Sequence, residues 1–123
     1  MSKVGFIGVG TMGCPMASNI ISKGNNLKFY DPYVHDDNKS KLENLGAQHC
    51  SSIKDLLDDS EFVITMLPNG NNVKDVCMGE DGLLKQEKKD FIYIDMSTIL
   101  PADSISINKE FESHNIKMFD APV

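Results

Sequence analysis

Residues 3–20 read KVGFIGVGTMGCPMASNI, in which a short apolar run is followed by a glycine-rich turn and a segment with helical spacing. Residues 4–7 have the length and residue types of a buried parallel strand. Residues 8–13 have the pattern G-x-G-x-x-G. One face of the helix that follows is expected to carry Met12, Met16, Ala17 and Ile20. This order of strand, turn and helix predicts a dinucleotide-binding site rather than an ordinary glycine-rich turn.

Each glycine of the turn has a physical reason. Gly8 allows a tight turn out of the strand, and Gly10 lacks the Cβ that would block a pyrophosphate. Gly13 lets the helix pack closely on the sheet. The first N–H groups of a helix have no partner inside it, and the helix dipole attracts anions to that end. The turn is therefore expected to hold a pyrophosphate through the backbone alone. Cys14 follows directly and is interpreted as a small apolar packing residue, the alternative being an oxidant-sensitive thiol.

An acidic residue ends the second predicted strand. Asp31 lies 18 residues beyond Gly13, close to the spacing at which a carboxylate meets the adenosine ribose. Such a carboxylate accepts hydrogen bonds from ribose hydroxyls and repels a 2′-phosphate. The chain contains no arginine, the usual partner of that phosphate, so NAD is favoured over NADP. The alternative is that Asp31 and Pro32 only begin a turn.

Strand-like and helical segments alternate along the whole chain. The predicted strands are residues 4–7, 27–30, 47–50, 61–67, 91–95 and 117–120. Helices are expected over residues 36–45, after an N-cap at Ser52, over 73–78 and over 102–114, and residues 68–72 read as a turn-rich loop. The inward positions expected on these helices are Leu42, Leu45, Leu56, Leu57, Ile105, Ile107 and Phe111. The alternation predicts an α/β fold of the Rossmann type, a doubly wound parallel sheet with strand order 3-2-1-4-5-6.

In such a sheet the ligand lies at the carboxyl ends of the strands, where the first and fourth strands are neighbours. The loops expected to meet there are residues 8–13, the end of the second strand at Asp31, residues 67–72 and residues 97–98. These segments are far apart in the sequence and converge only if the predicted strand order is correct.

Composition limits the classes of function. One domain of 123 residues with a net charge of −6 argues against a nucleic-acid or anionic-membrane partner, and no apolar run reaches the length of a membrane span. The three cysteines form no C-x-x-C pair, which argues against a zinc site or a disulfide framework. We expect no metal and a cytoplasmic location, with a mitochondrial one as the alternative if a leader precedes this chain.

Five motifs carry a more specific signal. GFIGVGTMGCPMASNI, FYDP, VITMLPN, YIDMSTI and FDAPV occur in this order at spacings that resemble those of the 3-hydroxyisobutyrate dehydrogenases, within the β-hydroxyacid dehydrogenase family. The resemblance implies an oxidoreductase that converts 3-hydroxyisobutyrate and NAD to methylmalonate semialdehyde and NADH in valine catabolism. Met96 departs from the family, in which serine is common at that position.

The resemblance also implies the cofactor-binding residues of this chain. They are Gly8, Gly10, Thr11, Met12 and Gly13 at the pyrophosphate, Asp31 at the ribose, Leu67, Pro68 and Asn72 in the loop after the fourth strand, and Ser97 and Thr98 beside the nicotinamide. In the family, a substrate-binding serine follows the last of the five motifs, a catalytic lysine lies further on, and a helical domain completes the cleft and dimerises. The lone histidines of this chain and Asp90, Asp95 and Asp103 are interpreted as structural or exposed residues.

The resemblance therefore implies that residues 1–123 are the NAD-binding domain alone, without a catalytic residue and inactive by itself. The hydroxy-acid substrate and the homo-oligomer would belong to the longer form. Other hypotheses remain at this point: a non-enzymatic nucleotide-binding module, a related β-hydroxyacid dehydrogenase with another substrate, and flavin or S-adenosylmethionine binding on the same fold.

Overall fold

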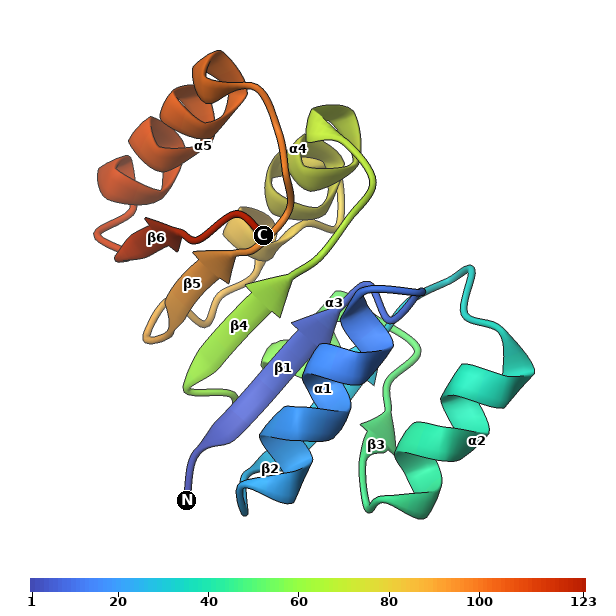
Figure 1. The fold of residues 1–123 in the computed structure, drawn as a ribbon. Coiled ribbons are helices and arrows are strands. Elements are labelled where there is room, and N and C mark those ends of the chain that lie inside the picture. Colours follow the sequence, from blue (N-terminus) through green and yellow to red (C-terminus); the bar gives the residue numbers. More distant parts are fainter.

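The computed structural model describes residues 1–123, and its centre is one six-stranded parallel sheet (Figure 1). The strand order β3-β2-β1-β4-β5-β6 confirms the predicted order. The strands are β1 (Lys3–Ile7), β2 (Asn26–Tyr30), β3 (Gln48–His49), β4 (Phe62–Thr65), β5 (Ile92–Asp95) and β6 (Met118–Asp120). The first strand pairs with both β2 and β4, so that Phe6 lies between Phe29 and Ile64. This neighbourhood is the switch point at which doubly wound sheets bind ligands.

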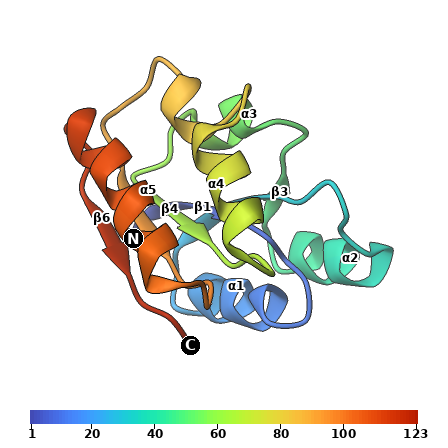
Figure 2. The same ribbon diagram turned by 90° about the horizontal axis from the view of Figure 1, so that it is seen from above.

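Helices cover both faces of the sheet (Figure 2). One face packs against α1 (Gly13–Ser22) and α2 (Asp36–Asn44). The other face packs against α3 (Ile53–Leu57), α4 (Gly70–Met78) and α5 (Pro101–Ser113), with a short 3-10 helix, η1 (Leu83–Lys85), after α4. None of these helices combines the length and the apolar composition that a membrane-spanning helix requires. No group of three or more His, Cys, Asp or Glu side chains is arranged to hold a metal ion.

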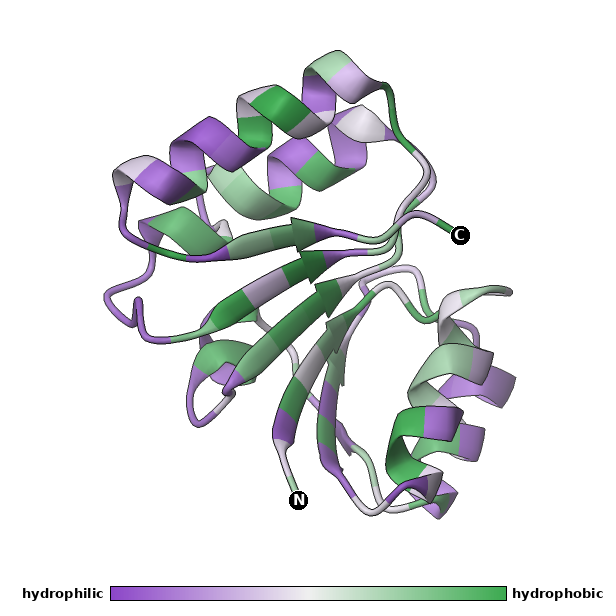
Figure 3. Ribbon diagram, turned by 60° about the vertical axis from the view of Figure 1, so that its left-hand side comes forward, coloured by the Kyte–Doolittle hydropathy of each residue, from purple (hydrophilic) through white to green (hydrophobic).

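Two apolar clusters, one on each face, hold these layers together. Phe6 and Phe29 pack with Ala17 of α1 and Leu42 of α2. The second cluster joins strand residues to α3, α4 and α5 and includes Val63, Leu56, Val73, Tyr93, Ile107 and Phe111. Burying one large apolar side chain contributes about 1.5–3 kcal/mol before the loss of conformational entropy is subtracted. Figure 3 shows the resulting pattern, with apolar strands inside and hydrophilic residues on the outer sides of the helices.

Two predicted inward positions are wrong. Leu45 is 46% exposed and Ile105 is 58% exposed. Leu45 follows the last residue of α2 and is the C-cap of that helix, outside its regular turns. Ile107 and Phe111 are four residues apart and share the buried face of α5, whereas Ile105 is two residues from Ile107 and therefore lies on the opposite side.

The fourth helix begins earlier than its pattern indicates. Residues 68–72 read as a loop, but α4 starts at Gly70 because the side chain of Asn69 accepts a hydrogen bond from the N–H of Asn72 at 3.0 Å. This is an N-cap, which stabilises the first turn. The predicted cap at Ser52 is confirmed by the analogous bond from the N–H of Asp55 at 3.1 Å.

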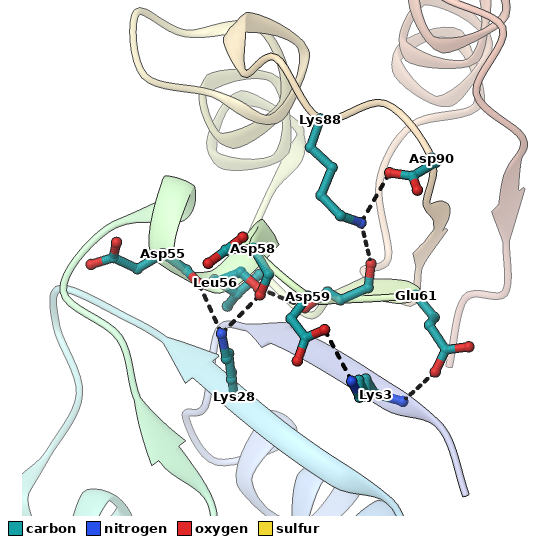
Figure 4. A network of polar contacts seen from close by, with 10 residues as sticks. Lys3, Lys28, Asp55, Leu56, Asp58, Asp59, Glu61, Lys88 and Asp90 are labelled. Carbon is teal, nitrogen blue, oxygen red and sulfur yellow. Dashed lines mark hydrogen bonds and ion pairs between the residues drawn. The ribbon is translucent and has the colours of Figure 1, made fainter.

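At the amino ends of the strands, lysines surround the segment that leads into β4 (Figure 4). Lys28 donates to the carbonyl oxygens of Asp55 and Asp58 at 3.2 and 2.8 Å. Lys88 donates to the carbonyl oxygen of Ser60 at 2.7 Å. Lys3 pairs with the carboxylate of Asp59 at 3.0 Å. We call Lys3, Lys28 and Lys88 the amino-edge lysines.

Candidate functional site

The glycine turn leaves β1 through a backbone conformation that favours glycine. Gly8 has φ +97°, and a Cβ placed on it would overlap the carbonyl oxygen of Met66 and crowd the side chain of Leu67. Its N–H donates to the carbonyl oxygen of Tyr30 at 3.2 Å, so the turn begins beside the last residue of β2. The predicted reason for Gly8, a tight exit from the strand, is therefore confirmed.

The other two glycines differ in what surrounds them. A Cβ on Gly13 would overlap the carbonyl oxygen of Gly8 and approach the ring of Phe6 at 3.2 Å, so only glycine allows α1 to lie this close to the turn. A Cβ on Gly10 would meet no protein atom within 4 Å. The space next to Gly10 is therefore open, as a bound pyrophosphate would require.

Four residues of the glycine turn have backbone donors without a partner. The N–H groups of Gly10, Thr11, Met12 and Gly13 donate to no acceptor in the chain. The first hydrogen bond of the helix is made by the N–H of Cys14 to the carbonyl oxygen of Gly10 at 2.9 Å. Donors of this kind at a helix N-terminus, together with the helix dipole, form an anion site.

Asp31 joins the end of β2 to the glycine turn. Its Oδ2 accepts the N–H of Val9 at 3.0 Å, and its Oδ1 accepts the N–H of Tyr33 at 2.9 Å. The alternative interpretation, a turn-starting residue, is thus correct for Oδ1. It does not exclude the other interpretation, because an ionised carboxylate has about four acceptor sites and two are used here.

These elements border a cleft of about 690 Å³ at the carboxyl ends of the strands. That volume lies within the range of about 300–1,000 Å³ typical of small-molecule and cofactor sites. All but two of the predicted cofactor-binding residues line it: Gly8, Gly10, Thr11, Met12, Gly13, Asp31, Leu67, Pro68 and Asn72. Met12, expected on the packed face of α1, is 52% exposed and faces this cleft instead.

Thr98 is one of the two exceptions and does not line the cleft. Its hydroxyl donates to the carbonyl oxygen of Val123 at 2.9 Å. Its neighbour Ser97 is buried, and the hydroxyl of Ser97 accepts the N–H of Leu67 at 2.8 Å. Ser97 is the second exception: it does not line the cleft itself, but it holds the backbone of Leu67, which does.

The far wall of the cleft was not anticipated from the sequence. It comes from α4 and the segment after it, and from α3 and the residues after β2: Tyr33, His35, Ile53, Asp75, Val76, Glu80, Asp81 and Gly82. Residues 79–84 read only as a glycine-containing turn. The only signal in the sequence was the presence of acidic residues at positions 75, 80 and 81. They can be assigned to the site only once α4 is known to border the same cleft as Asp31.

The charge of the cleft is negative. Asp31, Asp75, Glu80 and Asp81 line it, none of them is in an ion pair, and none of the twelve lysines is among the lining residues. A bound anion would meet no side-chain cation here. Any attraction for a pyrophosphate must come from the N–H groups of the turn and the dipole of α1.

Comparison with known proteins agrees with this geometry. The model of a protein family described as the NAD binding domain of 6-phosphogluconate dehydrogenase matches residues 3–123. The 3-sulfolactaldehyde reductase of Escherichia coli (strain K12) is 37% identical over 123 residues, which are 100% of this chain and 41% of that protein. The mitochondrial 3-hydroxyisobutyrate dehydrogenase of Homo sapiens is 42% identical over 120 residues, 98% of this chain and 35% of that protein.

A solved structure shows the same arrangement. The Mycobacterium tuberculosis 3-hydroxyisobutyrate dehydrogenase, determined with L-serine, superposes with a TM-score of 0.86 at 31% identity. The match covers 100% of this chain and 40% of that one. The chain thus spans about two-fifths of the length of the relatives it matches.

Proposed function

The chain belongs to the family of NAD-binding domains described for 6-phosphogluconate dehydrogenase, and from this premise we propose that its cleft binds NAD with the pyrophosphate on residues 8–13. The open space at Gly10, next to four unpaired N–H groups, is the observation that carries the proposal. As a domain of the β-hydroxyacid dehydrogenase-like oxidoreductases, it holds the group that accepts or supplies the hydride.

The residues fit the parts of that cofactor. The pyrophosphate would lie at the N-terminus of α1, where backbone N–H groups replace the side-chain cations that the cleft lacks. The free acceptor sites of Asp31 would take hydrogen bonds from the adenosine ribose. The nicotinamide half would extend past Leu67 and Pro68, over the second set of three strands.

The same charges favour NAD over NADP. A 2′-phosphate would lie beside Asp31 and opposite Asp75, Glu80 and Asp81, with no cation lining the cleft. Like charges at this range cost free energy, most of all in a partly enclosed cleft where water screens them less. The chain supplies no arginine that would offset the repulsion.

We propose that the enzyme oxidises 3-hydroxyisobutyrate. The support is a human 3-hydroxyisobutyrate dehydrogenase at 42% identity and a mycobacterial one at 31% identity with a TM-score of 0.86. The second candidate is the reduction of 3-sulfolactaldehyde, supported by the bacterial reductase at 37% identity over the whole chain. The two substrates are both short carbon chains that carry an anionic group, and the residues of this cleft do not distinguish them.

We expect residues 1–123 to bind NAD without turning over either substrate. Oxidation of a hydroxyl requires a group that takes its proton, and enzymes use a positioned lysine, histidine or carboxylate for this. No lysine lines the cleft, and in the proposed arrangement the histidine and carboxylates that do line it would surround the adenosine half: His35, Asp31, Asp75, Glu80 and Asp81. On this proposal, residues 1–123 by themselves would bind NAD just as a non-enzymatic module would. Turnover would require the rest of the enzyme.

Isothermal titration of the chain with NAD and with NADP tests the proposal. We expect NAD to bind at least about tenfold more tightly, a difference of about 1.4 kcal/mol. Asp31→Asn removes the charge but keeps the size of the side chain, and should reduce this preference to about threefold. Gly10→Val should keep the thermal stability of the wild type and lose NAD binding, because its side chain would fill the open space.

The outcomes separate the hypotheses. A folded wild type that binds neither nucleotide would contradict the proposal, and so would a Gly10→Val chain with unchanged NAD affinity. Consumption of NADH with 3-sulfolactaldehyde, or of NAD with 3-hydroxyisobutyrate, by residues 1–123 alone would contradict the expectation of binding without turnover and would identify the substrate.

A further inference from the structure

A chain of buried polar groups runs from α4 to the carboxyl end of β5. The thiol of Cys77 donates to the hydroxyl oxygen of Tyr93 at 3.3 Å, which lies 2.6 Å from the hydroxyl of Thr65. The Thr65 hydroxyl donates to Oδ1 of Asp95 at 2.8 Å. All four residues are buried, and Asp95 is only 1% exposed.

The direction of every donor in this chain is determined. The single proton of the Thr65 hydroxyl goes to Asp95, so the hydroxyl of Tyr93 must donate to Thr65. The Cys77 thiol in turn donates to Tyr93. Burial raises the pKa of Cys77 to about 12 and raises the pKa of Tyr93 well above its usual range, so both keep their protons at neutral pH. Each donor therefore points toward the carboxylate.

From the carboxylate the chain of bonds continues to the cleft. Oδ1 of Asp95 also accepts the N–H of Ser97 at 3.0 Å. The hydroxyl of Ser97 accepts the N–H of Leu67 at 2.8 Å, and Leu67 lines the cleft. Asp95 is thus two hydrogen bonds away from the loop after β4 without lining the cleft itself.

The stability of the fold does not explain why the buried residue 95 is an aspartate. Oδ2 of Asp95 is buried and has no hydrogen-bond partner, and no lysine pairs with Asp95. A buried carboxylate without a cation costs several kcal/mol relative to a well-packed apolar side chain. Groups retained at such a cost are frequent at functional sites.

We propose that Asp95 is a positioning residue for the nicotinamide half of the cofactor: it orients Ser97, which fixes the backbone of Leu67 against that half of the cleft. The inference rests on the proposed binding of NAD. In a doubly wound sheet each set of three strands serves one mononucleotide. Thr65 and Asp95 end two strands of the second set, and Leu67 and Ser97 lie in the loops that follow those strands. Loss of the network should therefore weaken binding of the nicotinamide half and leave the adenosine half unchanged.

Comparison of NAD with ADP-ribose, which lacks the nicotinamide, tests this by calorimetry. The wild type should bind NAD about fivefold more tightly than ADP-ribose. In Asp95→Ala and in the isosteric Thr65→Val, NAD affinity should fall to the level of ADP-ribose while ADP-ribose affinity stays within about twofold of the wild type. Asp95→Asn keeps an acceptor oxygen and should retain most of the preference for NAD.

Controls separate positioning from packing. Ser113→Ala removes a hydroxyl that bonds a backbone carbonyl on the exposed side of α5, and should change neither affinity. Equal loss of NAD and ADP-ribose binding in Thr65→Val would overturn the inference, because a general packing role predicts that result. So would an Asp95→Asn chain that behaves as Asp95→Ala does. A wild type that binds ADP-ribose and NAD equally would also overturn it but leave the proposed cofactor site standing, whereas a wild type that binds neither would remove both.

Discussion

Charged groups are arranged differently at the two ends of the parallel strands, which we call the amino edge and the carboxyl edge of the sheet. At the amino edge, Lys28 and Lys88 donate to the carbonyl oxygens of Asp55, Asp58 and Ser60, and Lys3 pairs with a carboxylate (Figure 4). At the carboxyl edge, four backbone N–H groups of the glycine turn have no acceptor, and the cleft is lined by carboxylates without a lysine. At the amino edge, the backbone acceptors are bonded by side chains of the protein itself. At the carboxyl edge, the backbone donors remain available to a ligand.

This difference shows how an acidic chain prepares a site for an anion. A lysine in the cleft would pair with Asp31, Asp75 or Glu80, and so compete with a ligand for the same space. Backbone donors at a helix N-terminus cannot be neutralised in this way, and they are already oriented before the ligand arrives. The amino-edge lysines stabilise the segment leading into β4, and none of them lines the cleft.

Gly13→Ala should have the largest effect on the carboxyl edge. The new Cβ would overlap the carbonyl oxygen of Gly8, so the turn and α1 must move apart. We expect a loss of about 2–4 kcal/mol in the free energy of unfolding and at least about a 100-fold loss of NAD affinity. Urea denaturation and calorimetry measure the two effects.

The matched control is Gly24→Ala, at the other end of α1. Gly24 has φ +92° but a Cβ there would meet no atom within 4 Å. Its cost should be only the left-handed backbone, about 1–2 kcal/mol, with NAD affinity unchanged. If the two variants lost NAD affinity equally, the turn would have no special role and the contrast between the edges would disappear.

The elements of this fold were predictable because their signals are local. The glycine turn, the apolar strands and the alternation of strand and helix can each be recognised from a few consecutive residues. Together with right-handed crossovers, they predict the strand order. The start of α4 was missed for a local reason of a different kind. Asn69 and Gly70 are typical of a turn, and Asn69 becomes an N-cap only because a helix follows it.

The parts of the site that depend on packing across the sheet were not predictable. Asp75 and Glu80 line the same cleft as Asp31 because the fold brings α4 and the residues after it close to the end of β2. No spacing in the sequence predicts this proximity. Thr98 follows the strand whose end approaches the site, but the direction of its side chain depends on the local path of the chain, and its hydroxyl bonds Val123. Asp95 forms no motif and acquires its contacts only in the folded sheet.

The two edges should also respond to pH in different ranges. Burial raises the pKa of Cys77, the first group of the buried network that leads to Asp95, from 9.0 to about 12. The folded state therefore favours the neutral thiol, so its contribution is complete below pH 9 and is lost as pH rises toward 12. Between pH 9 and 10.5 we expect the free energy of unfolding to fall by about 2 kcal/mol from this group. Cys77→Ser keeps a donor to Tyr93 but does not titrate there, and should lack this component in urea denaturation.

At the amino edge the sign is reversed. The hydrogen bond and charge of Lys3 lower the pKa of Asp59, so its contribution is present above pH 4 and is lost as pH falls. Asp59 is exposed, and the effect should be small. Equal loss of stability in wild type and Cys77→Ser above pH 9 would contradict the assignment of the alkaline loss to the buried thiol.

Lys28→Met should affect stability without affecting the cofactor. The ammonium of Lys28 bonds two carbonyl oxygens at the end of α3, and methionine keeps most of the apolar stem. We expect a loss of about 1–2 kcal/mol in the free energy of unfolding, as for charge-assisted hydrogen bonds at a helix C-terminus. NAD affinity, measured by calorimetry, should stay within about twofold. A larger loss of NAD affinity would mean that the amino edge does contribute to the site.

The smallest expected effect comes from placing a cation on the open edge. Glu80→Lys removes one of the carboxylates that face the cleft and adds an ammonium to a wall that has none. NADP affinity should rise about 3–10-fold at low salt, which corresponds to about 0.7–1.4 kcal/mol, and most of the gain should disappear at 0.5 M salt because exposed charges are screened. NAD affinity should change less, since the turn already holds its pyrophosphate.

Glu112→Lys on α5 is the control, because it changes the net charge by the same amount away from the cleft. Its NADP affinity should be close to that of the wild type. If Glu112→Lys raised NADP affinity as much as Glu80→Lys, the discrimination against NADP would arise from the net charge of −6 rather than from carboxylates in the cleft. The preference for NAD would then belong to the whole molecule, and the difference between its two edges would explain only where the pyrophosphate binds.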